Sequence, residues 1–360
     1  MSHEGNPPRP RPRSEPRPRA DPDPRSRADP RPCPCPCPCP QETRTQRLER
    51  ELRELAALAP GGVLLTARAR EAGWPEQLLY RRLRTGGWQQ IHRGAWAAPG
   101  RLVDWLTHAW VVQTLQPHLV CNHRTAAALH LIEVLGPAHT RHATEFTDPR
   151  PGPNRRRPGT RVHHLALTAA DRTVRRGLCT TSAVRTVGDL IRCLPRDEAV
   201  AAADSALSTR TVRGVRRPPL LQASALRTEL ARHRHGAVRA RSWLPLTDAL
   251  SGSPAESVAR LHLHDAGLHP ETQAALRTRS GRTLRPDFFF RAHGLVVEVE
   301  GYAFHGTREA HTRDLHRFND LQSCPEVRQV LRFTAQEVFH RPDRLLAQTR
   351  EALATLPPPR

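Results

Sequence analysis

The regular alternation of apolar and polar positions begins at residues 42–58. Apolar residues recur there three or four positions apart, which is typical of one face of a helix: Leu48, Leu52, Leu55 and Leu58. Residues 1–40 show no such pattern and are a low-complexity tract rich in proline and arginine with a Cys-Pro repeat. We therefore predict a disordered tail over 1–40 and folded structure from residue 41 onward.

Two short helices and a hairpin are predicted over residues 66–97. Thr66 is expected to cap a helix that Gly73 ends, and Pro75 to begin a second helix that runs to about Arg84. Residues 88–92 and 95–97 then read as two strands around a tight turn. Two helices followed by a hairpin predict a winged helix-turn-helix over 41–100.

The second of these helices has one apolar and one polar face. Leu78, Leu79 and Leu83 are expected to face the core. A recognition helix presents its polar face to the DNA major groove, so we predict nucleic-acid contacts by residues of this face and of the hairpin turn: Gln77, Tyr80, Arg81, Arg84 and Arg93. The alternative for Arg81 and Arg84 is an ordinary solvated helix face.

This segment resembles the winged-helix domain of AbiEi-like type IV antitoxins. The resemblance rests on Gly62-Val63-Leu64-Leu65-Thr66, Gly73-Trp74, Leu83-Arg84, Gly87-Trp88 and Ile91-His92-Arg93-Gly94-Ala95-Trp96. Residues 121–130 and 180–190 are similar to the domain that follows in that family. The resemblance implies DNA binding near the protein's own promoter and a cognate toxin protein as a further partner.

Residues 101–250 are expected to form an α-rich middle region with some strand. The tract 149–158, rich in proline and arginine, is predicted to be a loop within it. His123 and His130 lie seven residues apart on one helical face without a third ligand nearby, so we interpret both as structural.

A C-terminal domain is predicted over 251–360, beyond the Ser-Gly-Ser-Pro boundary at 251–254. Its pattern reads as a helix from 253 to 267, strands over 285–290, 295–301 and 330–334, and helices after 306 and from 343 to 353. This order predicts an α/β domain with a mixed sheet. The expected fold class of the whole chain is α+β multidomain.

Acidic residues interrupt the apolar strands of this C-terminal part. Glu298 and Glu300 lie two apart on one strand, so both project from the same face, and Asp287 directly precedes three phenylalanines. Clustered carboxylates repel one another unless a cation neutralises them. Mg²⁺ or Mn²⁺ is the expected cofactor, because hard divalent ions prefer oxygen ligands.

The same order of acids resembles the PD-(D/E)XK nuclease superfamily, and within it the very-short-patch-repair-like endonucleases. The matching residues are Glu256, Pro286-Asp287, Glu298-Val299-Glu300-Gly301, His305, Arg313-Asp314, Arg317, Asn319 and 330–334. The resemblance implies that Asp287 and Glu298 ligate the metal, supported by Glu256. It implies catalytic roles for Asp287, Glu298, Glu300 and His305, with His305 as the acid/base group, and phosphate contacts for Arg313 and Arg317. Many superfamily members carry a catalytic lysine where this chain has Glu300.

Each of these residues also has a plainer interpretation. Ser253 and Glu256 have the spacing of a helix capping box, and Glu298 with Glu300 fits the solvent face of an edge strand. Asp287 fits a strand entry, and His305 fits a structural histidine. The arginines of this region, Arg313, Arg317 and Arg332, fit a solvated basic face.

Composition supports a polyanionic partner. The formal net charge is +21 over 360 residues, and the chain has arginine but no lysine; the planar fork of arginine matches phosphate oxygens. GC-rich codon usage is the plainer explanation for the missing lysine, but it does not explain the excess of positive charge. Residues 1–40 contribute eight arginines and five acids, so most of the excess belongs to the folded part. The absence of a signal peptide, a long apolar run and a disulfide framework predicts a cytoplasmic protein without membrane association.

Taken together, these features predict a DNA-binding protein with a metal-dependent endonuclease-like domain, acting in defence or DNA repair. The alternative belongs to another class: a non-enzymatic, antitoxin-like transcriptional regulator that keeps the nuclease fold without turnover. The absence of lysine and the acid at position 300 favour the regulator, whereas the retained acids favour the enzyme.

Overall fold

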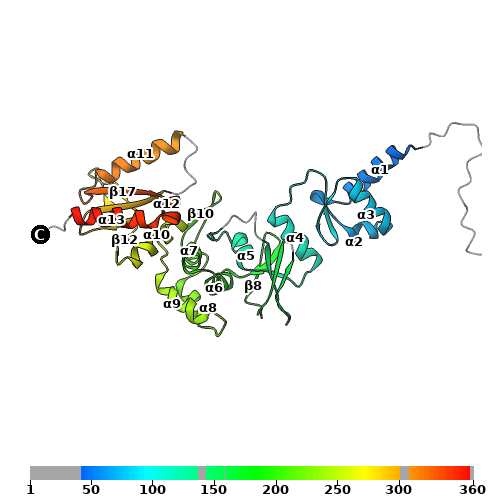
Figure 1. The fold of residues 1–360 in the computed structure, drawn as a ribbon, viewed down its shortest axis with the longest axis horizontal. Helices are drawn as coiled ribbons and strands as arrows, with labels where there is room; N and C mark the ends of the chain where they lie inside the picture. The colour runs from blue at the N-terminus through cyan, green and yellow to red at the C-terminus, as the bar shows by residue number, and fades with distance from the viewer. Residues whose placement is uncertain (1–41, 137–142, 158, 301–307, 357–360) are drawn as a thin grey trace, which may run out of the picture. The chain divides into compact units, whose positions relative to one another are not determined.

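The computed structural model describes residues 42–136, 143–157, 159–300 and 308–356 (Figure 1). The chain separates into two units, Met1–Glu51 and Leu52–Arg360. Helices and several sheets, some of them mixed, alternate along the described residues, so the fold is a mixed α/β arrangement. The expected α+β class is confirmed at this level.

The first described elements are three helices, a 3₁₀ turn and a three-stranded antiparallel sheet of order β1-β3-β2. Their bounds are α1 (Arg44–Ala57), the 3₁₀ turn η1 (Pro60–Gly62), β1 (Val63–Leu65), α2 (Thr66–Glu71), α3 (Glu76–Thr85), β2 (Gln89–His92) and β3 (Ala95–Ala97). Leu79 and Leu83 of α3 are fully buried with Leu64, Trp88 and Trp96, as their spacing predicts. The helices and the hairpin are confirmed as elements.

Thr66 does not cap α2, contrary to expectation. It is the first residue of the helix, and its hydroxyl donates to the carbonyl of Gly94 at 3.3 Å. The backbone N–H of Thr66 also donates to that carbonyl, at 2.9 Å. The side chain therefore ties α2 to the hairpin turn, a partner that lies 28 positions away and that helix-capping preferences do not reveal.

A six-stranded mixed sheet of order β6-β7-β5-β4-β9-β8 follows α4 (Trp105–Leu115). Its strands and the helix among them are β4 (Val120–Cys121), α5 (His123–His130), β5 (Thr144–Asp148), β6 (Arg155–Arg157), β7 (Thr160–His164), β8 (Arg172–Arg175) and β9 (Leu178–Thr181). The expectation of a loop over 149–158 is wrong at its end, because residues 155–157 pair with β7. Short strands with many arginines carry too weak an alternation to be recognised by pattern.

Helices dominate the rest of the middle region. They are α6 (Ala183–Cys193), α7 (Arg196–Leu207), α8 (Ala223–Ala231) and α9 (Ala237–Trp243), with the hairpin β10 (Arg210–Val212) and β11 (Val215–Arg217) and the 3₁₀ turn η3 (Leu244–Leu246). Apolar side chains of α6, α7 and α8 form one core, which includes Val187, Leu190, Ala203 and Leu226.

The C-terminal part contains a mixed four-stranded sheet of order β12-β15-β16-β17, in which β16 and β17 are parallel. Its elements are α10 (Pro254–Asp265), β12 (Glu271–Thr272), β13 (Leu276–Arg277), β14 (Thr283–Leu284), β15 (Phe288–Phe290), β16 (Leu295–Glu300), α11 (Arg308–Gln322), β17 (Gln329–Thr334), α12 (Ala335–His340) and α13 (Pro342–Thr355). The three main strands lie where the apolar runs predicted them. The short strands β12, β13 and β14 and helix α12 were not predicted.

Consecutive phenylalanines of β15 pack on opposite faces of this sheet. Phe288 and Phe290 pack with the helices α10, α12 and α13, whereas Phe289 packs with Val296 and with Leu321 of α11. Burial on both faces explains the continuous apolar run. It also places Asp287, the residue before β15, next to a dry core.

No helix within the described residues is both long enough and apolar enough to cross a bilayer. The described cysteines, Cys121, Cys179, Cys193 and Cys324, are free thiols.

Candidate functional site

Three of the predicted acids come from three separate elements of the C-terminal part. Glu256 lies in the first turn of α10, Asp287 precedes β15, and Glu298 lies on β16. β15 and β16 are antiparallel with Phe288 opposite Val297, which brings the residue before β15 to the level of Glu298 and Val299. The fold thus gathers residues that are up to 42 positions apart.

Asp287 is held by two hydrogen bonds. Its Oδ2 accepts the backbone N–H of Val299 at 2.8 Å, and its Oδ1 accepts the side-chain amide of Gln273 at 3.0 Å. The pKa of Asp287 nevertheless lies well above its usual value, because burial and the nearby acids Glu256 and Glu298 all disfavour its charge. The carboxyl group is therefore short of positive charge in its surroundings.

Glu256 is buried and forms only half of the predicted capping box, because its carboxylate bonds the N–H of Gly252 instead of that of Ser253. Ser253 caps α10 by accepting the backbone N–H of Glu256 at 3.1 Å, and the Glu256 carboxylate accepts the N–H of Gly252 at 2.6 Å. Its Oε2 also lies 3.5 Å from the amide nitrogen of Gln273, the residue that bonds Asp287. Burial raises the pKa of Glu256, and the charge of Glu298 adds to this.

Glu298 is paired with Arg317 of α11. The guanidinium donates to both carboxylate oxygens, at 3.2 Å from Nε and 2.9 Å from Nη2, and also to the carbonyl of Arg285 at 2.9 Å. Although burial lowers the pKa of Arg317, its bond to Glu298 and the fields of Asp287 and Glu256 raise it overall. Arg317 is thus the cation of this acidic cluster, an interpretation that neither sequence alternative included.

Glu300 is engaged elsewhere. It alternates with buried Val297 and Val299 on β16 as predicted, but its carboxylate pairs with Arg332 of β17 at 2.6 Å. The Arg332 guanidinium also lies 5.5 Å from the centre of the Phe318 ring. His305 lies outside the described residues, and so does the side chain of Arg313 within α11.

The donor set suits a hard divalent cation in its chemistry. Three carboxylates lie near the Arg317 guanidinium, and the pKa values of Asp287 and Glu256 are raised, first by burial and then by the neighbouring acids. Within the described ranges, however, no three His, Cys, Asp or Glu side chains converge closely enough to form a metal-binding group. A cation held by all three acids would require side-chain movements, including that of the Glu298 carboxylate away from Arg317.

Gln273 is the site residue that sequence reasoning missed. It follows β12, has a left-handed backbone with φ of +53°, and donates to Asp287 from its side chain. A non-glycine residue in this region costs about 1 kcal/mol or more and recurs at functional sites. Nothing in its sequence surroundings indicates either the conformation or the contact.

The predicted nucleic-acid surface of α3 is exposed as expected. Gln77, Arg81 and Arg84 point to solvent and line one shallow hollow together with Glu76, Tyr80 and Thr85. Tyr80 is half-buried, and its ring centre lies 6.2 Å from that of Trp96. Arg93 is exposed at the hairpin turn, next to Gly94 with φ of +91°. Their geometry is open to a ligand, with Tyr80 as part of the hydrophobic support.

Two histidines of α5 are buried, in keeping with a structural role. One ring nitrogen of His130 lies 2.7 Å from the carbonyl of Thr181. The ring of His123 lies 4.4 Å from that of His163, and burial lowers the pKa of His123 to about 4. The pairing of His123 with His163 on β7 was not predicted, because it depends on strand order.

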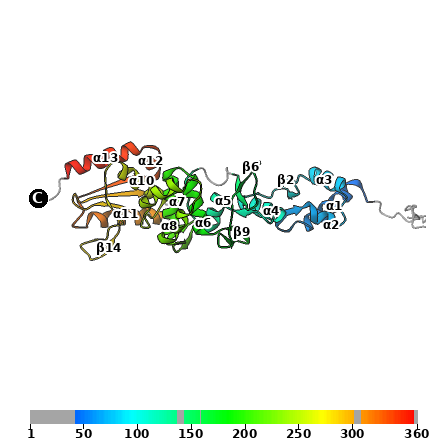
Figure 2. The same cartoon turned by 90° about the horizontal axis from the view of Figure 1, so that it is seen from below.

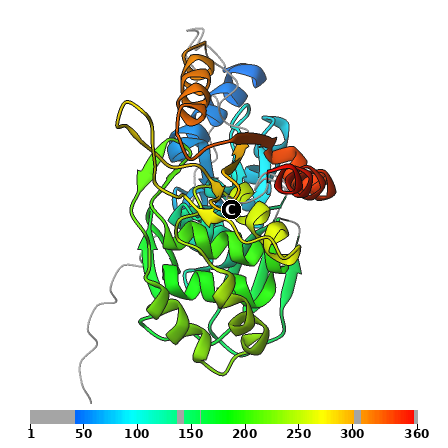
Figure 3. The ribbon, with the colours of Figure 1, turned by 90° about the vertical axis from the view of Figure 1, so that its left-hand side faces the viewer.

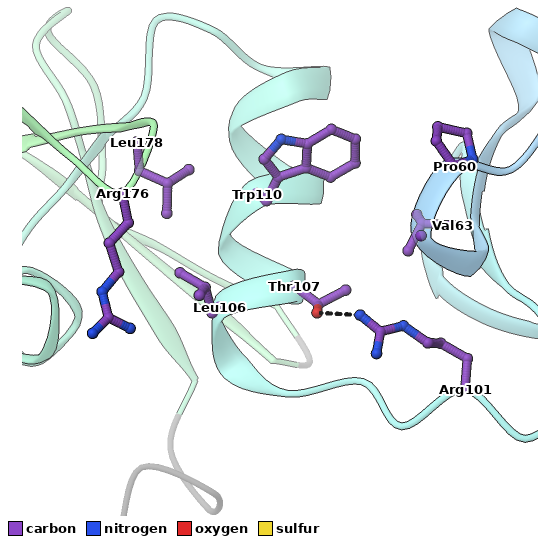
Figure 4. A pocket seen from close by; sticks show the side chains of 9 residues that line it. Pro60, Val63, Arg101, Leu106, Thr107, Trp110, Arg176 and Leu178 are labelled. Carbon is purple, nitrogen blue, oxygen red and sulfur yellow. Dashed lines mark hydrogen bonds between the residues drawn. The ribbon is translucent and has the colours of Figure 1, made fainter. Parts of the chain in front are cut away.

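A separate hollow of about 280 Å³ lies beside α4 (Figure 4). Its walls include Trp110, Leu106 and Leu178, and Arg101 donates there to Thr107 at 3.4 Å. No acid or histidine lines it, so it offers no group for proton transfer or metal binding.

Comparison with known proteins gives relatives without an assigned activity. No protein-family model matches the chain. The uncharacterized proteins MT2308 and Rv2248 of Mycobacterium tuberculosis (strains CDC 1551 and H37Rv) are each 31% identical over 175 residues, which cover 48% of this chain and 60% of each relative. The crystal structure of the RV2827C protein from Mycobacterium tuberculosis covers 64% of this chain and 89% of its own at 18% identity, with a TM-score of 0.40. The chain is thus similar, over about half its length, to mycobacterial proteins whose names state no function.

Proposed function

We propose that this protein binds DNA through α3 and its hairpin and hydrolyses phosphodiester bonds with a divalent-metal-dependent site formed by Asp287, Glu298 and Glu256. The observation that carries the proposal is the gathering of these three acids from separate elements against a dry core. Buried carboxyl groups whose pKa values are shifted by one another cluster at functional sites. The similarity to very-short-patch-repair-like endonucleases of the PD-(D/E)XK superfamily supports the same function.

In this proposal Asp287 and Glu298 hold Mg²⁺ or Mn²⁺, and Glu256 supports them from α10. A bound divalent ion supplies Lewis-acid stabilisation of the charge that develops on the phosphate. Val299 and Gln273 fix the Asp287 carboxylate by hydrogen bonds. Arg317 lies beside the site, and its guanidinium would be suited to bind a phosphate oxygen if Glu298 held the ion instead of Arg317.

The DNA-binding part of the proposal rests on charge and exposure. Arg81, Arg84 and Arg93 are exposed around an open surface, in a chain of net charge +21. The order of elements also fits: α2 is short, α3 follows it with arginines on its exposed face, and the hairpin of β2 and β3 comes next. Helix-turn-helix proteins place the second helix in the major groove. The similarity to AbiEi-like antitoxins supports this assignment. A protein that binds DNA in this way would act in the cytoplasm, and we include that location in the proposal.

Two ion pairs favour a second candidate, a DNA-binding regulator without turnover. Arg317 neutralises Glu298 with two hydrogen bonds, so the acid that a metal requires is already satisfied. Glu300 is likewise paired with Arg332, in the place where many nucleases of this superfamily carry lysine. A protein of this kind would act as an antitoxin-like repressor with a cognate toxin as partner.

Cleavage of supercoiled plasmid by the purified full chain tests the enzyme. We expect nicking with Mg²⁺ or Mn²⁺, none with EDTA, and none for Asp287→Ala or Glu298→Ala when both variants keep the wild-type thermal unfolding curve. Wild-type protein that shifts DNA in a gel but cuts it under none of these conditions would establish the regulator instead.

Titration calorimetry with Mn²⁺ separates the two candidates without relying on activity. If Arg317 competes with the ion for Glu298, then Arg317→Gln binds Mn²⁺ about 10-fold more tightly than the wild type, and Asp287→Asn does not bind it. A tenfold change in affinity corresponds to roughly 1.4 kcal/mol of binding free energy. Absence of Mn²⁺ binding in both wild type and Arg317→Gln would rule out the metal site.

A further inference from the structure

A short β-ribbon stands beside the carboxylate site. β13 and β14 pair antiparallel, with Leu276 opposite Leu284 and Arg277 opposite Thr283, and residues 278–282 form the tip. The ribbon projects away from the sheet that contains β16 (Figures 2 and 3). It belongs to neither the predicted elements nor the proposed metal site.

The base of the ribbon is anchored in the core. Leu276 and Leu284 are buried with Phe289 of β15, Val296 of β16 and Leu321 of α11. Burial of these two leucine side chains stabilises the position of the ribbon. The ribbon is therefore fixed to the sheet rather than free to swing.

The tip of the ribbon is also ordered. Thr278 is buried inside it, donates its N–H to the carbonyl of Arg282 at 2.9 Å, and accepts the N–H of Arg282 on its hydroxyl at 3.0 Å. The N–H of Gly281 donates to the carbonyl of Thr278, at 2.9 Å. Arg282 in turn pairs with Asp320 of α11 at 2.7 Å. Such bonds hold the tip in one conformation, so its remaining side chains are presented without a large entropic cost.

Two arginines of the ribbon are left for a partner. Arg277 and Arg279 are exposed, and within the described part of the chain neither side chain forms a hydrogen bond or an ion pair. Most other arginines of this C-terminal part are engaged, as Arg282, Arg291, Arg317 and Arg332 show. Unpaired guanidinium groups on a rigid ribbon point to an anionic ligand of extended shape.

The ribbon emerges directly from the carboxylate site. Gln273 and Asp287 flank it in sequence and close its base, with the N–H of Gln273 donating to the carbonyl of Asp287 at 3.1 Å. Their side chains are bonded as well, at 3.0 Å. Arg285 adds a bond from its guanidinium to the carbonyl of Gln273 at 3.1 Å. The base of the ribbon is therefore part of the carboxylate site, and a ligand that extends along the ribbon from tip to base reaches Asp287.

We infer that the ribbon of β13 and β14 is a second DNA-contacting element, separate from α3, which binds the phosphates of a duplex through Arg277 and Arg279. A two-stranded ribbon fits the width of the major groove, and arginines at its edge and tip reach the flanking phosphates. The inference rests on the proposed function, because its consequence is that the bound strand is placed beside Asp287.

Fluorescence anisotropy with a labelled 25-base-pair duplex, about two and a half helical turns, measured with the full chain over a series of salt concentrations without metal, tests the inference. Arg277→Gln/Arg279→Gln is expected to weaken binding about 10-fold at moderate salt. It is also expected to lower the slope of log K against log salt by about 1.8, since each lost phosphate contact releases about 0.9 fewer ions. Arg277→Lys/Arg279→Lys is expected to keep most of the slope, because lysine retains the charge.

The matched control is Arg213→Gln/Arg216→Gln, which removes the same charge from exposed arginines of the β10–β11 hairpin. All variants must unfold at the wild-type temperature. If the ribbon and control variants lose equal affinity, the ribbon has no special role and the inference is overturned while the proposed function stands. If the wild type binds no duplex, both the inference and the DNA-binding function are overturned.

Discussion

Asp287 accepts hydrogen bonds from Val299 and Gln273, yet it also faces two other acids. In its own stretch of sequence the nearest charged neighbour is Arg285, whose guanidinium bonds the carbonyl of Gln273 instead. The charge state of this residue is therefore set by burial and by Glu256 and Glu298, which come from other elements. Its folded pKa lies well above the usual 3.8.

Asp287→Asn is expected to stabilise the metal-free protein at neutral pH. A folded pKa above the unfolded value means that the folded state holds its proton more tightly. The stability from Asp287 is then complete below about pH 4 and is lost as pH rises through the folded pKa. Thermal unfolding in EDTA should show equal melting temperatures for wild type and variant near pH 3.5, and a higher one for the variant at pH 8.

The same experiment with Mn²⁺ supplies the control. The ion should raise the melting temperature of the wild type at pH 8 but leave that of Asp287→Asn unchanged. A variant that melts lower than the wild type by the same amount at both pH values would show that Asp287 is simply a hydrogen-bonding strand-entry residue.

At the scale of elements, α3 has one face that packs in the core and another that is exposed for binding. Its N-terminus follows Pro75, Glu76 stands in the first turn, and Gly87, with φ of +72°, lies just beyond its end. Leu79 and Leu83 are buried, whereas Arg81 and Arg84 are exposed. Residues two positions apart thus have unrelated tasks because the helix turns them to opposite sides.

Arg81→Gln/Arg84→Gln is expected to weaken duplex binding about 10-fold without changing thermal unfolding, because exposed guanidinium groups contribute to phosphate contacts and not to packing. Leu79→Ala is the counterpart. It should destabilise the fold by about 3 kcal/mol, since it leaves a cavity in the core. Gel-shift titration and thermal unfolding of both variants check the division; unchanged binding by the arginine variant would identify a solvated face only.

At the scale of the molecule, ion pairs join the middle region to α10, the helix that carries Glu256. Arg260 of α10 pairs with fully buried Asp204 of α7 at 2.9 Å, and Arg196 of α7 pairs with Asp265 of α10 at 2.5 Å. Burial raises the pKa of Asp204, and Arg260 opposes that rise. The position of Glu256 thus depends on a partner helix outside its own sheet.

Arg260→Gln is expected to destabilise the protein by roughly 3 kcal/mol, because it leaves Asp204 buried without its counter-charge. Arg196→Gln removes the partly exposed pair between the same helices and should cost less than about 1 kcal/mol. Denaturant unfolding of both variants measures the difference. If the two variants lose equal free energy of unfolding, burial of the Arg260–Asp204 pair does not make it more important for stability than the exposed pair.

The sequence by itself predicted most of the local structure that later frames the site. Helical spacing identified α1, α3 and α10, and apolar runs identified β15, β16 and β17. A helix with one buried face has apolar residues every three or four positions, and a strand buried on both faces is a continuous apolar run. Short elements escaped, among them β6, β12, β13 and β14. They have too few residues for a period to appear.

The candidate acids were also found from sequence, but their surroundings were not. The spacing of Glu298 and Glu300 placed them on one strand, yet only the tertiary structure paired one with Arg317 and the other with Arg332. Only the tertiary structure showed that the Gln273 side chain bonds the Asp287 carboxylate and that these two residues lie at the base of the ribbon. Hydrogen bonds and charge pairs act over a few ångströms between residues that are distant in the chain. The sequence determined which charged and hydrogen-bonding side chains the protein has, and tertiary packing determined which of them are in contact.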